Sequence, residues 1–176
     1  MGSEKSQPVS VSRRISAPAG TIFELLADPG SHPKVDGSGM LREGATNPVI
    51  SGVGDVFVTR MHTDAQGDYE MANEVFEYEL NRRIGWAPGL RAAANPANFL
   101  VPIGTRPGHR WSFELTPDGP DATIVTEIYD CSDALDIVRV AVDNGNEWIE
   151  TMTTTLQLLD ELCAGAGRVR GSPTAD

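Results

Sequence analysis

Residues 147–163 read EWIETMTTTLQLLDELC, and this stretch decides the fold. Its apolar side chains recur at spacings of three and four residues, at Trp148, Met152, Leu156, Leu159 and Cys163. Residues at these spacings share one face of an α-helix, so the pattern predicts an amphipathic helix with one face made for burial. Asn144 is expected to cap the start of this helix, and Gly165 and Gly167 are expected to end it. A single helix cannot bury such a face alone, so a broad partner must lie against it.

The residues before this helix predict that the partner is a β-sheet. Apolar and polar side chains alternate with period two in residues 9–15, 55–63, 69–80, 109–116 and 122–129, with a weaker candidate at 40–45. Residues 84–86 form a further short strand, which Pro88 and Gly89 are expected to end. A short helix follows the first strand, and residues 132–142 also have helical spacing. Short turns join most strands, so we expect an α+β fold with an antiparallel sheet and a long C-terminal helix.

Length and composition predict one domain. The chain has 176 residues, of which 40% are hydrophobic and 22% are charged. We expect a disordered N-terminus at residues 1–7, a single domain at 8–164 and a flexible tail at 165–176. The first residues lack the basic and apolar regions of a secretory signal, so Cys131 and Cys163 are expected to be reduced thiols in a cytoplasmic protein.

The charge balance argues against two classes of partner. The net charge is −11, and phosphate backbones and anionic membranes both need a basic face. No window approaches the ~18 consecutive apolar residues of a membrane-spanning helix. We therefore expect no nucleic acid and no membrane span, and a monomer or homodimer.

Five stretches of local sequence resemble the START/Bet v 1-like superfamily, also called SRPBCC, and in particular its polyketide cyclase/dehydratase and lipid-transport branch. They are residues 11–18 (VSRRISAP), 23–29 (FELLADP), 82–86 (RRIGW), 109–115 (HRWSFEL) and 125–130 (VTEIYD). The resemblance covers roughly residues 8–163 and implies a helix-grip fold, in which a curved antiparallel sheet wraps the C-terminal helix around an apolar cavity. Members of this superfamily bind lipids, polyketides, sterols or aromatic metabolites, and a minority catalyse reactions on them. These motifs belong to the framework and carry no catalytic signature.

Large side chains of the strands, of the 90–108 segment and of the long helix are the candidates for a ligand-binding wall. They are Trp86, Phe99, Trp111, Phe113, Tyr129, Trp148 and Met152, with Phe76 and Tyr78 as further aromatic candidates. The alternative interpretation is plain packing between sheet and helix. Residues 90–108 hold several prolines and glycines between two strands, which indicates a lid over one end of the cavity.

General acid–base chemistry is the catalytic possibility that the residues leave open. The candidates are Arg60, His62, His109, Glu127 and Tyr129. Arg60 and His62 share one strand face, which on the alternative interpretation faces solvent. His109 has the same parity as Trp111 and Phe113, so we expect it at the inner rim of the sheet. No metal or cofactor is expected, because His32, His62 and His109 are far apart and no metal-ligand motif is present.

Three functions remain open from the sequence. The first is binding of a small hydrophobic metabolite in the internal cavity. The second is a polyketide cyclase or dehydratase activity, which a carboxylate or histidine at the cavity floor would favour. The third is a protein-interaction or quinone-chaperone-like module, which a large exposed apolar patch would favour.

Overall fold

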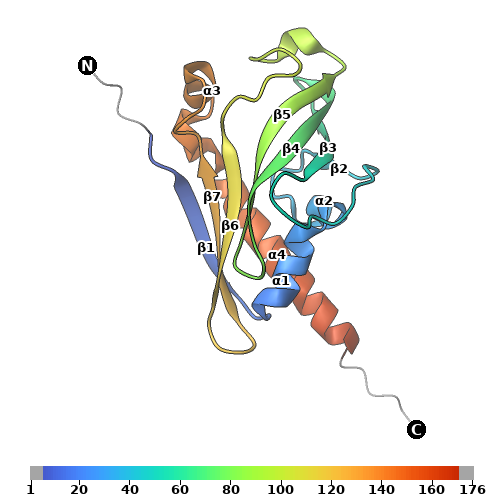
Figure 1. Ribbon diagram of the computed structural model, residues 1–176, viewed down its shortest axis with the longest axis vertical. Coiled ribbons are helices and arrows are strands. Elements are labelled where there is room, and N and C mark those ends of the chain that lie inside the picture. Colours follow the sequence, from blue (N-terminus) through green and yellow to red (C-terminus); the bar gives the residue numbers. More distant parts are fainter. Residues whose placement is uncertain (1–5, 171–176) are drawn as a thin grey trace.

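The computed structural model describes residues 6–170 as one antiparallel sheet with helices on one side (Figure 1). The strands are β1 (Val9–Ile15), β2 (Leu41–Arg42), β3 (Val56–Thr63), β4 (Gly67–Glu79), β5 (Arg83–Ala93), β6 (Arg110–Pro117) and β7 (Thr123–Asp130). The helices are α1 (Ala19–Ala27), α2 (His32–Val35), α3 (Asp136–Ala141) and α4 (Ile149–Arg170), with 3-10 turns at Pro29–Ser31, Pro96–Asn98 and Asp143–Trp148. The predicted α+β fold with an antiparallel sheet and a long C-terminal helix is confirmed.

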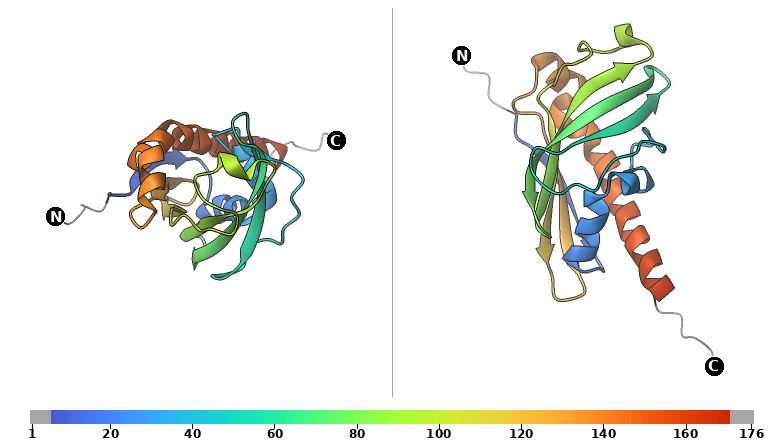
Figure 2. Two further views of the ribbon diagram at one scale, coloured as in Figure 1. Left: turned by 90° about the horizontal axis from the view of Figure 1, so that it is seen from above. Right: turned by 45° about the vertical axis from the view of Figure 1, so that its right-hand side comes forward.

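The sheet has the strand order β1-β7-β6-β5-β4-β3-β2, and every neighbouring pair is antiparallel. The N-terminal strand therefore pairs with the last strand, and the remaining strands follow as hairpins. Figure 2 shows the sheet curling around α4, with α1 and α2 beside that helix. One concave face of the sheet is thus closed by helices, which creates an interior between the two layers.

The amphipathic pattern of α4 is confirmed by its burial. Met152, Leu156 and Leu159 are fully buried, while Gln157 and Glu161 on the opposite face are exposed. Leu156 and Leu159 belong to the main hydrophobic core, which also contains Ile15 of β1. The long helix is therefore held by the sheet, as its apolar face requires.

Both predicted ends of this helix are wrong. Asn144 has φ 52° and ψ 27° inside a 3-10 turn, whereas an N-cap residue needs an extended backbone, and α4 begins only at Ile149. Gly165 and Gly167 do not take the left-handed conformation that ends helices, and α4 continues to Arg170. The expected flexible tail is therefore helical over 165–170. Its remainder, 171–176, and residues 1–5 of the expected disordered N-terminus lie outside the described residues.

The expected end of a strand at Pro88 and Gly89 is also wrong, because β5 continues to Ala93. β5 pairs with β6 only as far as Trp86, so beyond that residue one edge of the strand has no ladder to complete. Pro88 lies opposite Asn73 of β4 and has no N–H to donate. Because β6 does not pair with β5 at this position, the missing N–H breaks no hydrogen bond between those two strands. The extension carries Pro88 and Leu90 into the interior of the fold.

A β-bulge in β4 changes which aromatic side chains face inward. Val75 lies opposite Trp86 and Glu77 opposite Gly85, so Phe76 is the extra residue. Phe76 is 38% exposed, and the Arg110 guanidinium lies 5.4 Å from its ring centre. Phe76 is therefore on the outer face and does not line the interior, contrary to the candidate set from the sequence.

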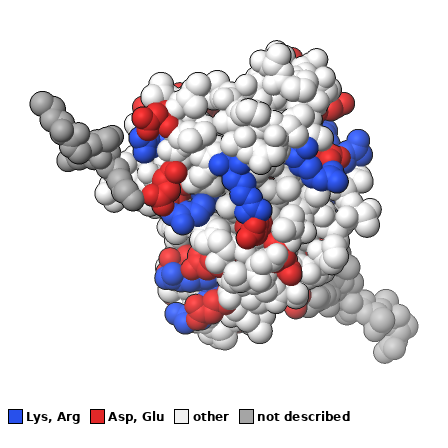
Figure 3. Space-filling model, turned by 45° about the horizontal axis from the view of Figure 1, so that its top comes forward, with Lys and Arg blue, Asp and Glu red and all other residues white. Residues whose placement is uncertain are grey.

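Charged side chains of both signs lie together on the molecular surface (Figure 3). The described ion pairs include Arg83 with Glu77 and Glu114, Arg91 with Glu70, Arg106 with Glu74, and Arg110 with Asp130. On the face shown, blue groups sit beside red ones and form no separate basic patch. Within the part of the chain that is described, no helix is both long and apolar enough to cross a bilayer.

We predict that Gly37→Ala strongly destabilises the fold, because Gly37 is where the chain after α2 touches α4. A Cβ there would lie 2.3 Å from the Thr151 carbonyl oxygen and 2.6 Å from the Thr155 nitrogen, both of them helix backbone. The free energy of unfolding should fall by about 2 kcal/mol, as overpacking of a core does. Gly52→Ala is the matched control, since nothing lies within 4 Å of its Cβ position. Equal urea midpoints for the two variants would contradict this account of the contact.

Candidate functional site

A cavity of about 410 Å³ lies between the concave face of the sheet and the helices. Its wall comes from all four helices, from strands β2 to β7, from the 3-10 turn that ends at Trp148, and from the loops after α2 and between β5 and β6. Thr59, Asn73, Thr151 and Thr155 add polar atoms to a wall that is otherwise mainly apolar. The dimensions and lining are those of a small-molecule site.

Five of the side chains expected to bind a ligand lie on this wall. They are Trp86, Phe99, Trp111, Phe113 and Trp148. All three tryptophans of the chain are among them. Period-two alternation on β6 accounts for Trp111 and Phe113, which point inward as their parity predicts. Whether these residues contact a ligand stays a prediction.

Tyr129 and Met152 lie behind the wall and do not line the cavity, which corrects the sequence-based assignment. Tyr129 is 2% exposed, and its ring centre lies 4.6 Å from that of Trp111 and 6.1 Å from that of Trp148. Met152 is fully buried in the same cluster, which also contains Cys131. The indole rings of Trp111 and Trp148 line the cavity in front of this cluster.

Three side chains that line this one cavity each carry a buried polar atom without a hydrogen-bond partner. These atoms are His109 Nδ1, Glu127 Oε2 and Trp148 Nε1, which are the side-chain atoms of this kind within the described residues. The His109 ring lies 5.7 Å from the Tyr129 ring, which Trp148 also contacts, and Glu127 is the preceding inward residue of β7. We call His109, Glu127 and Trp148 the polar end of the cavity. Buried polar groups in proteins are nearly always paired, so this cluster points to a missing partner.

Burial makes both titratable groups of the polar end neutral near pH 7. It raises the pKa of Glu127 to about 8, with a smaller contribution from the nearby Asp36 charge. It lowers the pKa of His109 to about 4. Burial also raises the pKa of Tyr129, and the nearby Trp148 indole opposes that rise. The Trp148 N–H nevertheless forms no hydrogen bond with the protein. The polar end is thus an uncharged set of hydrogen-bonding groups.

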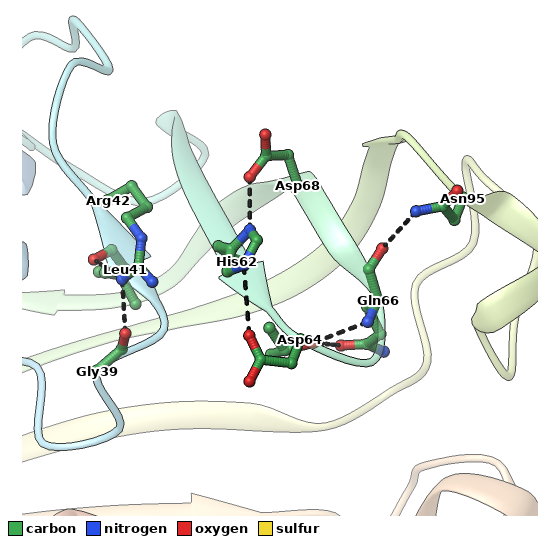
Figure 4. A network of polar contacts seen from close by, with 9 residues as sticks. Gly39, Leu41, Arg42, His62, Asp64, Gln66, Asp68 and Asn95 are labelled. Atoms are coloured by element: carbon green, nitrogen blue, oxygen red, sulfur yellow. Dashed lines mark hydrogen bonds and ion pairs between the residues drawn. The ribbon is translucent and has the colours of Figure 1, made fainter.

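Arg60 and His62 do not belong to the cavity, which corrects their place among the catalytic candidates. β3 turns Phe57, Thr59 and Met61 inward, so the residues between them face outward. His62 Nδ1 lies 2.7 Å from Asp68 Oδ1, and His62 Nε2 lies 3.8 Å from Asp64 Oδ1 (Figure 4). The alternative interpretation, in which this face is exposed to solvent, is correct. Alternation alone could not show which of the two strand faces was exposed.

His32 and Asn73 are two of the wall residues that the sequence analysis missed. His32 stacks on Trp86 with ring centres 5.1 Å apart, and its Nε2 lies 2.8 Å from the Leu26 carbonyl oxygen. Burial lowers the pKa of His32. Asn73 is 3% exposed, and its amide donates to the Thr59 hydroxyl at 3.2 Å. The four-residue α2 is too short for a periodic signal, but the parity of Asn73 with Val75 on β4 would have placed it inward.

The segment 90–108 covers part of the cavity, although its first residues belong to β5. Phe99, Leu100 and Val101 contribute to the wall, and the Phe99 ring lies 5.0 Å from that of Tyr69. Backbone hydrogen bonds tie the loop to β5, since Leu90 N–H donates to the Thr105 carbonyl at 3.0 Å. The loop therefore forms one wall of the cavity, and its mobility as a lid stays a prediction.

We predict that the free energy of unfolding falls as pH rises from 6.5 to 8, by about 1–2 kcal/mol. Folded Glu127 keeps its proton up to about pH 8, whereas the unfolded chain releases it near 4.5, so unfolding releases a proton in this window. The lowered pKa values of His109 and His32 act in the opposite direction, but only below their ordinary value of 6.5. Urea denaturation should show a flat profile for Glu127→Gln. The exposed Glu147→Gln is the control and should keep the slope; a slope unchanged by Glu127→Gln would refute the assignment.

Comparisons with known proteins give distant relatives. No family model matches the chain. The uncharacterised protein Rv0088 of Mycobacterium tuberculosis H37Rv is 31% identical over 122 residues, which are 69% of this chain and 46% of that protein. The protein MT0096 of strain CDC 1551 is 33% identical over the same shares. The chain spans about half the length of the curated relatives it matches.

Solved structures share the arrangement of most of the chain. Protein NE0264 from Nitrosomonas europaea has a TM-score of 0.66 at 16% identity, covering 92% of this chain and 96% of that one. A protein from Arthrobacter aurescens has a TM-score of 0.65 at 13% identity, covering 91% and 87%. The chain has a helix-grip fold. Identities this low show the fold alone, and the function must be argued from the site.

Proposed function

We propose that this protein binds a small, largely apolar molecule in the cavity between its sheet and α4. The observation that carries the proposal is the group of three unpartnered polar atoms on one apolar cavity wall. Each buried polar atom that lacks a partner costs about 1–3 kcal/mol, so an occupant that supplies partners stabilises the protein at three points. A few polar groups on the wall of an otherwise apolar cavity are typical of ligand sites.

The volume of the cavity supports the same proposal. An empty cavity would leave the side chains of its wall without contact partners on one side. Water is a poor substitute where aromatic and aliphatic side chains dominate the wall, because each buried water needs two to four polar partners. A mainly apolar occupant fits the wall better than either alternative.

Membership of the START/Bet v 1-like superfamily is part of this proposal. The five stretches that resemble it supply strands and helices of the observed fold, including β6 with its inward Trp111 and Phe113. The helix-grip arrangement agrees with what that resemblance implies. Binding of lipids, polyketides or aromatic metabolites is thus the function class that the sequence and the cavity jointly favour.

Acid–base catalysis on the bound molecule is the second candidate, of the polyketide cyclase or dehydratase type. Glu127 favours it, because a carboxyl with a pKa of about 8 can hold or release a proton near neutral pH. Neutral His109 lines the same cavity and can accept a hydrogen bond from the bound molecule. Loss of turnover with retained ligand binding in Glu127→Gln would favour this candidate over simple binding.

Native mass spectrometry of the freshly purified protein tests the proposed binding. We expect an excess mass on the folded protein that disappears under denaturing conditions. If the protein carries none, N-phenyl-1-naphthylamine, a neutral apolar fluorescent probe, should bind the empty cavity with one-to-one stoichiometry. A protein that carries no small molecule and fails to bind this probe would contradict the proposal.

A further inference from the structure

We infer that the cavity selects uncharged molecules that carry a hydroxyl or carbonyl group at the polar end, and that it rejects carboxylates such as fatty acids. This inference rests on the proposed binding function and narrows it to a chemical class. It follows from the charges on the wall and from the hydrogen-bonding capacities of the three unpartnered atoms.

The wall offers no permanent positive charge that could pair with an anionic ligand. Its ionisable side chains are His32, Asp36, Tyr69, His109 and Glu127, and among the described residues no lysine or arginine lines it. The Asp36 carboxylate already accepts hydrogen bonds from the Ser38 and Leu41 N–H groups and from the Ser38 hydroxyl. A carboxylate brought inside would therefore be desolvated beside two acidic groups without a cationic partner.

The three unpartnered atoms define what the polar groups of the ligand must do. Trp148 Nε1 carries a hydrogen and only donates, so the ligand needs an acceptor oxygen. Glu127 and His109 can each donate or accept when neutral, so they accommodate either a hydroxyl or a carbonyl. An ammonium group can donate to Glu127 and to His109, but it has no acceptor for the Trp148 N–H to meet.

The protonation of the polar end agrees with an uncharged ligand. Burial holds Glu127 in its acid form, with a pKa of about 8, and holds His109 in its neutral form. An anion placed beside Glu127 would raise the pKa of that carboxyl further and would itself stay unpaired. A neutral hydroxyl or carbonyl instead exchanges its hydrogen bonds with water for bonds with the polar end.

A matched ligand series tests the inference by displacement of N-phenyl-1-naphthylamine at pH 7. The series is 2-methylnaphthalene, 2-naphthalenemethanol, 2-naphthoate and 2-naphthylmethylammonium, which share one ring system and differ at one substituent. We expect the alcohol to displace the probe at a concentration at least tenfold lower than the carboxylate does, and also below the ammonium and the methyl compound. A carboxylate or ammonium that matches or exceeds the alcohol would overturn the inference.

Variants assign the selectivity to the polar end. Glu127→Leu and Trp148→Phe should each reduce the advantage of the alcohol over 2-methylnaphthalene by about fivefold or more, while 2-methylnaphthalene itself still binds. Glu147→Gln changes an exposed carboxyl and should leave the whole series unaltered. An alcohol advantage that survives both cavity substitutions would overturn the role of the polar end. If neither the probe nor 2-methylnaphthalene binds the unaltered protein, it is the proposed binding function that fails.

Discussion

Leu159→Ala should lower the free energy of unfolding by about 3 kcal/mol. Leu159 is fully buried on α4 in the main core, which also contains Phe23 of α1 and Val125 of β7. Truncation of a buried leucine removes apolar contacts and leaves a void that the surroundings only partly refill, and such changes cost about 2–5 kcal/mol. Chemical denaturation measures the effect directly.

Gln157→Ala is the control for that measurement. Gln157 is exposed on the other face of α4, where its amide donates to Glu161 at 3.1 Å. Its substitution should change stability by less than about 0.5 kcal/mol. If Leu159→Ala had an equally small effect, α4 would not be the element against which the sheet packs.

Trp111→Ala should weaken binding of N-phenyl-1-naphthylamine by at least tenfold. Trp111 lies on the wall between Trp86 and Tyr129 of the neighbouring strands, and its ring centre is 5.6 Å from that of Trp148. Loss of this indole removes a stacking surface and opens the wall next to the polar end. A fluorescence titration gives the dissociation constant.

Phe76→Ala is the matched control, because Phe76 is an aromatic residue on the outer face of the same sheet. Its removal should leave the dissociation constant within about twofold. Trp111→Phe keeps an aromatic wall and should recover most of the affinity lost in Trp111→Ala, which separates loss of the wall from loss of the fold. Binding that is untouched by Trp111→Ala would place the probe somewhere else.

Sequence periodicity predicted those parts of the fold in which one repeating pattern extends over several turns or residues. The stripe that contains Leu156 and Leu159 required a buried face, and the alternation around Trp111 and Phe113 required a strand with that face inward. The bulge at Phe76 and the continuation of β5 through Pro88 depend on which strands pair at that point. Local sequence does not contain that information.

The candidate site was predictable to a similar extent. The parity of His109 with Trp111 indicated the inner rim, and His109 does lie on the cavity wall. Glu127 was one candidate among five, because nothing in the sequence showed that Arg60 and His62 face solvent while Glu127 is 5% exposed. The cavity brings His109, Glu127 and Trp148 onto one wall from positions far apart in the chain, so only the folded structure reveals this group.

The indole N–H resonances of Trp86, Trp111 and Trp148 provide the most direct test that this cavity is the ligand site. All three tryptophans line the cavity, so every indole N–H signal in the ¹H–¹⁵N spectrum reports on the wall. Stoichiometric N-phenyl-1-naphthylamine should shift all three resonances, with the unpartnered Trp148 N–H among them. Probe binding that leaves the three resonances in place, and shifts only amides of outward residues such as His62 and Phe76, would contradict the account.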